Sequence, residues 1–156
     1  MLCNQAGIDL IKEFEGCKLN SYQDQAGIWT IGYGTTGPFV TPNMTIEQAT
    51  ADAWLINHID TVAAALTRMI KTPINENQFA ALVSLAYNIG VGAFSNSSAL
   101  GVLNEGYIDQ VPAKMMLWDK ITVGGQHIVD AGLVRRRQAE VNLYNTPVSS
   151  GVTTNV

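Results

Sequence analysis

Three residues near the start of the chain have the types and the spacing that acid–base chemistry on a water molecule requires: Glu15, Asp24 and Thr30. A glutamate held partly away from water can donate a proton to a leaving group. A nearby aspartate can accept a proton from water, and a threonine hydroxyl on a strand has a fixed direction in which to hold that water. Glycoside hydrolysis uses two carboxyl groups in unlike environments together with a water molecule held beside them.

The position of Glu15 on its helix gives it an unusual environment for a glutamate. Seven helical steps fall about 20° short of two turns, so Glu15 lies on the face that Ile8 and Ile11 mark as buried. Glu15 also stands in the last helical turn, where the macrodipole disfavours a carboxylate. Both effects favour the protonated form, which a general acid needs. The alternative is a purely structural ion pair with one of the arginines at 135–137.

Asp24 and Thr30 each have an ordinary structural explanation as well. Aspartate is common at the first position of a turn, and Asp24 opens the turn at residues 24–27. Threonine is common in strands. The combined spacing, nine residues from Glu15 to Asp24 and six more to Thr30, favours one site over three separate structural roles.

The elements that position these groups follow from local patterns. Apolar residues at a spacing of three predict a helix over residues 6–15, which Gly16 ends. Strand-forming residues on both sides of a turn predict a β-hairpin over residues 22–34. The acid is therefore expected at a helix end, with the other two groups on the hairpin that follows.

The remainder of the chain has helical periodicity. Thr45 and Gln48 match a capping box, which predicts the start of a long helix over residues 45–71. Asn75 is expected to cap a helix that is apolar nearly all round and therefore buried. The later helices are predicted at residues 76–89, 98–104, 108–119 and 133–144.

These elements predict a mostly helical α+β fold. A small N-terminal sheet lobe is expected over residues 16–44, and the long helix joins it to a C-terminal helical bundle over residues 75–145. Residues 1–145 would form a single domain, and residues 146–156, rich in Ser, Thr and Val, would form a loose tail. A cleft between the two lobes is where a ligand site is expected.

The composition excludes several classes of protein. The 156 residues carry a net charge of -4, which argues against a nucleic-acid binder. We find neither a signal peptide nor an apolar stretch long enough to span a membrane. Cys3 and Cys17 are too few for a disulfide framework and fit no zinc spacing, so we expect free thiols, no metal and no cofactor.

The segments that carry the three candidate residues resemble those of a known family. LIKEFEG at residues 10–16 and YQDQAGIWTIGYG at residues 22–34 are similar to phage-type lysozymes (endolysins) of glycoside hydrolase family 24, which include the T4 lysozyme kind and a shorter lambdoid kind. QFAALVS at 78–84, YNIGVGAF at 87–94 and GLVRRR at 132–137 favour the lambdoid branch. The resemblance covers residues 5–145.

The resemblance implies a lysozyme-like domain that acts as an N-acetylmuramidase. Such an enzyme hydrolyses the β-1,4 bond between N-acetylmuramic acid and N-acetylglucosamine in peptidoglycan and thereby lyses the host. Glu15 would be the general acid, Asp24 would assist the water or stabilise positive charge on the sugar, and Thr30 would position the water. Tyr87 and Ser97 would contact the substrate; the alternatives are a core aromatic residue and a helix N-cap.

The resemblance also implies a route to the substrate and contains one departure. The chain is similar to endolysins that wait in the host cytoplasm, as monomers, until a holin opens the inner membrane and gives access to the cell wall. The family usually has histidine after Gly34, where this chain has Thr35. The absence of the histidine removes a possible ion pair near the cleft. This puts the local stability in question but does not affect the expected chemistry.

Three other functions are compatible with parts of this pattern. A non-catalytic peptidoglycan-binding module would not need Glu15, Asp24 and Thr30 intact. A lytic transglycosylase dispenses with water, and Asp24 argues against it. A plain helical interaction domain would use the hairpin only as a connector.

Overall fold

Helix α1, Gln5–Glu15, begins where the side chain of Asn4 accepts a hydrogen bond from the backbone N–H of Gly7. In the computed structural model, which describes residues 1–149, the helix ends at Gly16. The φ of Gly16 is 65°, in the left-handed region that glycine adopts without strain. The helix predicted over residues 6–15 is confirmed, and Glu15 is its last residue.

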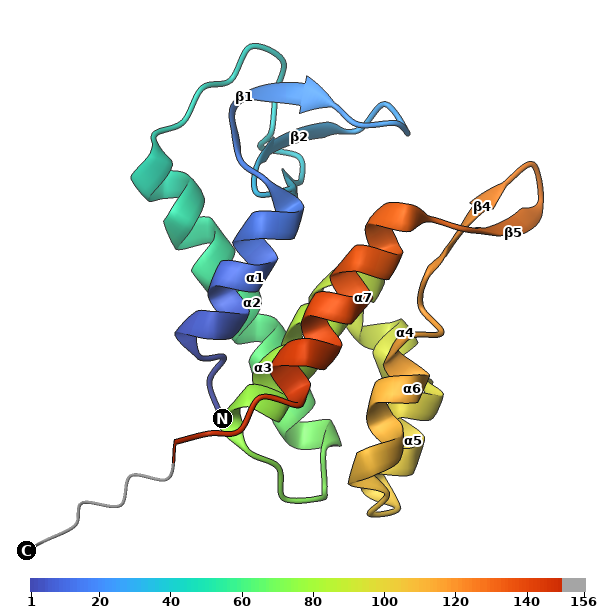
Figure 1. Ribbon diagram of the computed structural model, residues 1–156. Helices are drawn as coiled ribbons and strands as arrows, with labels where there is room; N and C mark the ends of the chain where they lie inside the picture. Colours follow the sequence, from blue (N-terminus) through green and yellow to red (C-terminus); the bar gives the residue numbers. More distant parts are fainter. Residues whose placement is uncertain (150–156) are drawn as a thin grey trace, which may run out of the picture.

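Three strands form a small antiparallel sheet beyond the end of α1 (Figure 1). They are β1 Lys18–Gln23, β2 Trp29–Gly32 and β3 Thr35–Thr36, in that spatial order. β1 and β2 form the predicted hairpin, and Tyr22 lies opposite Thr30. The sequence analysis missed β3, which pairs with β2 after the chain turns back through Gly32 and Gly34, both at positive φ.

The predicted start of the long helix is wrong by three residues. Helix α2 is Gln48–Met69, and its N-cap residue Glu47 makes no capping hydrogen bond through its side chain. Thr45 instead bridges to Asn20 of β1, and its hydroxyl donates to the Asn20 amide oxygen at 2.8 Å. The capping-box pattern of Thr45 and Gln48 does not start the helix, because the sheet lobe holds this segment.

Helix α3, Glu76–Ile89, is the buried centre of the helical lobe, as its apolar surface predicted. Its start is the capping box of Asn75 and Gln78. The helix contacts α1, α2 and α7 (Figure 1). The other helices are α4 Val91–Ser95, α5 Ser98–Asn104, η1 Ile108–Gln110, α6 Val111–Met115 and α7 Ala131–Tyr144.

The prediction for residues 108–119 is wrong, and a second hairpin was missed. The helical part ends at Met115 and is broken into η1 and α6. Strands β4 Lys120–Val123 and β5 Gln126–Val129 follow, and they project from the start of α7 (Figure 1). Gly124 and Gly125 form the two-residue turn, both at positive φ. All eight strand residues are exposed, so no alternation of burial could reveal them in the sequence.

The expected fold class, mostly helical α+β with a sheet lobe and a helical lobe joined by a long helix, is confirmed. Residues 146–149 of the predicted tail follow α7, and residues 150–156 lie outside the described part. The division into one domain and a tail stays a prediction. Across residues 1–149, no helix is both long and apolar enough to cross a membrane.

Gly7 allows α1 and α3 to approach closely, which gives a test of the fold. A Cβ at Gly7 would lie 2.5 Å from Cys3 Sγ and 2.8 Å from Ala80 Cβ. We expect Gly7→Ala to lower the free energy of unfolding by about 1–3 kcal/mol through overpacking. Gly101 of α5 is the control, because nothing lies within 4 Å of its added Cβ. Gly101→Ala should be neutral or stabilise by about 0.5–1 kcal/mol in urea titrations. Equal stability of both variants would contradict this packing.

Candidate active site

Glu15 stands where the end of α1, the sheet and α7 meet. Its Oε1 accepts a hydrogen bond from Arg136 Nη1 at 2.6 Å, so the expected alternative of pairing with an arginine is realised. Its Oε2 is directed to the other side, where a Cβ added at Gly34 would lie 3.6 Å from it. Oε2 makes no hydrogen bond within residues 1–149. The Glu15 side chain is 21% exposed, which leaves this second oxygen accessible.

Asp24 and Thr30 both hydrogen-bond to the backbone of Ile28. Asp24 Oδ1 accepts hydrogen bonds from the N–H groups of Ala26 and Ile28, at 2.8 and 2.9 Å. The Thr30 hydroxyl donates to the Ile28 carbonyl at 2.9 Å, so its own oxygen remains an acceptor. Asp24 therefore does stabilise the turn, as its ordinary structural explanation predicted. Only Oδ1 takes part in these hydrogen bonds, which also fix the direction of Oδ2.

Tyr22 lies on β1, opposite Thr30 of β2. Burial, and then the negative charges of Asp24 and Glu15, raise the pKa of the Tyr22 hydroxyl. Asp24 and Thr30 thus lie in the turn and on the second strand of the β1–β2 hairpin, and Glu15 ends the helix that precedes it.

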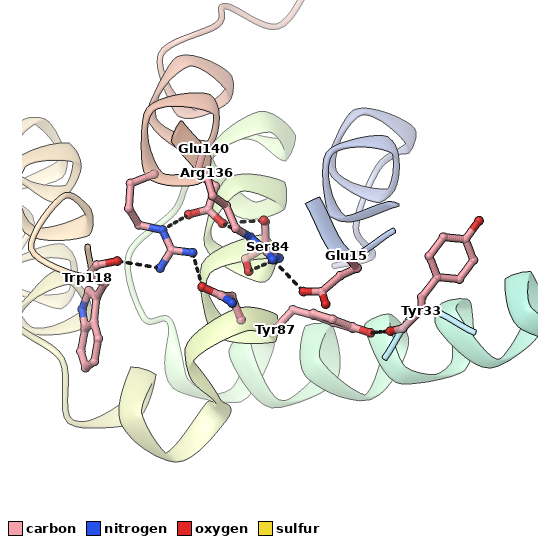
Figure 2. Close-up of polar contacts among 9 residues, drawn as sticks. Glu15, Tyr33, Ser84, Tyr87, Trp118, Arg136 and Glu140 are labelled. Carbon is pink, nitrogen blue, oxygen red and sulfur yellow. Dashed lines mark hydrogen bonds and ion pairs between the residues drawn. The ribbon is translucent and has the colours of Figure 1, made fainter. Parts of the chain in front are cut away.

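Tyr87 of α3 also lies at this site. Its hydroxyl donates to the backbone carbonyl of Tyr33 at 3.2 Å, beside Glu15 (Figure 2). Burial and the charge of Glu15 raise the pKa of Tyr87 to about 12, and Arg136 opposes them. Tyr87 is half-buried and packs against the core, so it has a structural role in addition to its place next to the acid.

Ser97 is a helix cap. It is the N-cap residue of α5, and its hydroxyl accepts a hydrogen bond from Leu100 N–H at 3.2 Å. The same hydroxyl donates to the Phe94 carbonyl at 2.6 Å. The alternative explanation, an N-cap, is confirmed. Because both hydrogen bonds are local and the side chain is buried, we leave Ser97 out of the candidate site.

The effect of Thr35 on local stability stays a prediction, and the structure shows how this segment is held. Thr35 of β3 pairs with Ile31 of β2. The sheet is fastened to α2 by Tyr33, whose hydroxyl donates to Asp52 Oδ1 at 3.0 Å. Hydrogen bonds from Gln48 and Tyr33 lower the pKa of Asp52. A hydrogen bond from Tyr33 to the Asp52 carboxylate thus connects the sheet lobe to α2.

The sequence analysis missed the groups behind Arg136. Glu140 is fully buried and accepts from Ser84 Oγ at 2.5 Å and from Arg136 Nε at 3.4 Å (Figure 2). Arg137 Nε lies 2.7 Å from Glu140 Oε1. The N–H is not aimed at that oxygen, so the contact is an ion pair without hydrogen-bond geometry. The sequence did contain a signal for these ion pairs. Glu140 follows Arg136 by four residues and Arg137 by three, and side chains at these spacings are neighbours on a helix.

A cavity of about 290 Å³ adjoins the acid on the side of α7 and is lined by Glu15, Asn88, Asp130, Arg135 and Arg136 among others. A smaller cavity of about 170 Å³, lined by Met1, Thr67 and Phe79 among others, does not include the acid. Within residues 1–149, no three His, Cys, Asp or Glu side chains are grouped as a metal site would need. The chemistry that the arrangement can perform is proton transfer between carboxyl groups and a bound water.

Comparison with known proteins identifies the family of this chain. The family model for phage lysozyme matches residues 12–140. The endolysin of Acyrthosiphon pisum secondary endosymbiont phage 1 is 40% identical over 94% of this chain and 99% of its own length. Several other matching endolysins are longer, and the chain spans 57–63% of them.

Two solved structures extend the similarity to the fold. The muramidase domain of SpmX from Asticaccaulis excentricus has a TM-score of 0.87 at 37% identity, and the match covers 93% of this chain and 98% of that one. An endolysin from Escherichia coli O157:H7 phage FAHEc1 has a TM-score of 0.85 at 38% identity, over 93% and 94% of the two chains.

The position of Ser97 leads to a test that separates a cap from a substrate contact. We expect Ser97→Ala to lower the free energy of unfolding by about 0.5–2 kcal/mol, because one backbone N–H of α5 loses its acceptor. At a temperature where the variant is folded, KM for cell-wall substrate should stay unchanged. A raised KM without a loss of stability would restore Ser97 to the site.

We expect His58 to make the stability of the protein depend on pH. Its ring lies 4.5 Å from the ring of Tyr87, between centroids. Burial lowers the pKa of His58 below 6.5, and Glu15 partly opposes this. Protonation therefore favours the unfolded chain: the contribution to stability is present above pH 6.5 and is lost as the pH falls through the folded-state pKa.

We expect His58→Gln to flatten this loss of stability, as measured by urea unfolding at several pH values between about 7 and 5. His127 on the exposed β5 strand gives the control, and His127→Gln should keep the wild-type pH dependence. An unchanged slope in His58→Gln would mean that other groups cause the acid sensitivity.

Proposed function

Because this chain belongs to the phage lysozyme family, we propose that it is an endolysin that hydrolyses bacterial peptidoglycan and lyses the host cell. We assign it the N-acetylmuramidase reaction, cleavage of the β-1,4 bond between N-acetylmuramic acid and N-acetylglucosamine. The observation that carries this assignment is the half-buried Glu15 at the end of α1, whose Oε1 is held by Arg136, next in the chain to the hairpin that holds Asp24 and Thr30. The relatives named as endolysins and a muramidase support it.

Glu15 is the general acid in this proposal. Arg136 fixes Oε1, so that Oε2 is the oxygen that meets the glycosidic oxygen on the side of Gly34. Rigid placement of the proton donor contributes to catalysis because the leaving oxygen must lie within hydrogen-bond distance. The Glu15 side chain is 21% exposed, so only part of this carboxyl group faces water.

Asp24 and Thr30 act on the other side of the scissile bond. The Ile28 backbone holds the Asp24 carboxylate through Oδ1, which leaves Oδ2 to accept a proton from water or to stabilise positive charge on the sugar. The Thr30 hydroxyl donates to Ile28, so a water can donate to its oxygen. The pair thus places a water and a base together.

The geometry favours hydrolysis over the other functions considered. A transglycosylase needs no base for water, whereas the Asp24 carboxylate is fixed by two backbone N–H groups. A binding module has no use for a half-buried acid with one oxygen free. Accumulation as a monomer in the host cytoplasm and release by a holin stay predictions.

Removal of the acid gives the direct test. Glu15→Gln should reduce the clearing of chloroform-permeabilised Gram-negative cells by roughly 100-fold or more, because the general acid is lost. The matched control is Glu13→Gln, two residues away on the exposed side of α1, which should clear at the wild-type rate. Circular dichroism verifies that both variants are folded.

The outcomes distinguish the alternatives. Clearing retained by Glu15→Gln would remove Glu15 as the acid. Binding to peptidoglycan without clearing by the wild type would favour the binding module. Mass spectrometry of released fragments reports the reaction, since anhydro ends would identify a transglycosylase.

A further inference from the structure

Glu140 lies at the centre of a group of buried charges that ends at the catalytic acid. Four side chains alternate in sign, Glu15, Arg136, Glu140 and Arg137, and we call them the charge cluster. The side chain of Arg136 is 5% exposed, and those of Glu140 and Arg137 are fully buried. Buried charges are costly unless they are paired, so each member constrains the next.

One guanidinium is shared by two carboxylates. Arg136 donates through Nη1 to Glu15 at 2.6 Å and through Nε to Glu140 at 3.4 Å. It also donates through Nη2 to the Ser84 carbonyl at 3.4 Å. Figure 2 shows Arg136 between Glu140 and Glu15. Arg136 therefore cannot direct its whole charge at Glu15 while Glu140 is ionised.

The other partners of Glu140 hold it in place. Arg137, which contacts Glu140, donates to Asn88 Oδ1 at 2.5 Å and to the Trp118 carbonyl at 3.3 Å. Burial raises the pKa of Glu140, and Arg137, Ser84 and Arg136 oppose this effect and favour the carboxylate. Burial lowers the pKa of Arg137, and Glu140 opposes that shift.

We propose that Glu140 is a positioning residue that controls the proton affinity of Glu15 through Arg136. The inference rests on the proposed role of Glu15 as the acid. By sharing the guanidinium, Glu140 limits how strongly Arg136 stabilises the Glu15 carboxylate. It also adds a second negative charge behind that guanidinium. Both effects help Glu15 to keep its proton to a higher pH than Arg136 alone would allow.

Several other titratable or charged side chains lie near Glu15. Those facing the acid or lining its cavity are Tyr22 on β1, His58 on α2, Tyr87 on α3, and Asp130, Arg135 and Arg136 on α7 and its N-cap. The pKa values of both tyrosines are raised, so they stay neutral over the working range. The pKa of His58 is lowered, so it titrates on the acid side. None of these three replaces Glu140 as the group behind Arg136.

The experiment is a carboxyl ¹³C NMR titration of Glu15 in the wild type and in Glu140→Gln, with the Glu15 signal assigned by its loss in Glu15→Gln. We expect the midpoint to fall by about one pH unit in Glu140→Gln, because Arg136 then pairs with Glu15 alone. The alkaline limb of the kcat profile on peptidoglycan should fall by the same amount, and KM should not change.

Ser84→Ala is the matched control, because it removes a hydrogen bond from the same buried group without removing a charge. Its midpoint should equal that of the wild type. If Glu140→Gln does not fold, Glu140→Asp keeps the charge farther from Arg136 and should give a smaller fall.

An unchanged or raised midpoint in the folded Glu140 variant would overturn the proposal. Equal falls in Ser84→Ala and Glu140→Gln would also overturn it, since loss of packing would then be the cause. The titration is independent of activity. If the wild type did not cleave peptidoglycan but the midpoint fell as expected, the proposed function would fail and the coupling between Glu140 and Glu15 would stand.

Discussion

The contact between Arg136 and Glu15 is the interaction on which the rest of the structure depends. It joins the end of α1 to α7 across 121 positions of sequence, with 2.6 Å between Nη1 and Oε1. A guanidinium that is 5% exposed must be paired, so the packing of α7 on α3 has to supply partners for it. The Glu140 carboxylate and the Ser84 carbonyl are these partners. The helical lobe therefore positions Glu15, although Glu15 lies beside the sheet.

The sheet lobe positions Asp24 and Thr30 through hydrogen bonds of its own, independent of the charge cluster. The backbone of Ile28 binds the Asp24 carboxylate with its N–H and the Thr30 hydroxyl with its carbonyl. Asp24 in the turn and Thr30 on β2 are thereby fixed by the same segment of the hairpin. Tyr33 then fastens the sheet to α2 through Asp52, which sets the position of this pair relative to the acid.

The sequence predicted the features that depend on local pattern and missed those that depend on distant partners. Helix α1 and the capping of α3 follow from apolar spacing and turn chemistry, which act over a few residues. The capping box at Thr45 failed because Asn20 of β1 captures its hydroxyl, and no local rule contains that contact. The hairpin at residues 120–129 was missed because it has no buried face.

In the function that we propose, the charge cluster allows Glu15 to be held in one place and still to donate a proton. A lone ion pair with Arg136 would fix Glu15 but would also hold it as a carboxylate, as the alternative explanation in the sequence analysis required. With Glu140 on the other side of the Arg136 guanidinium, Arg136 still holds Glu15 in place. Its charge, however, stabilises the Glu15 carboxylate less strongly. Buried ion pairs are weak sources of stability, and an apolar replacement is often more stable. We therefore attribute this group, three buried charges and the half-buried Glu15, to the placement and protonation of Glu15.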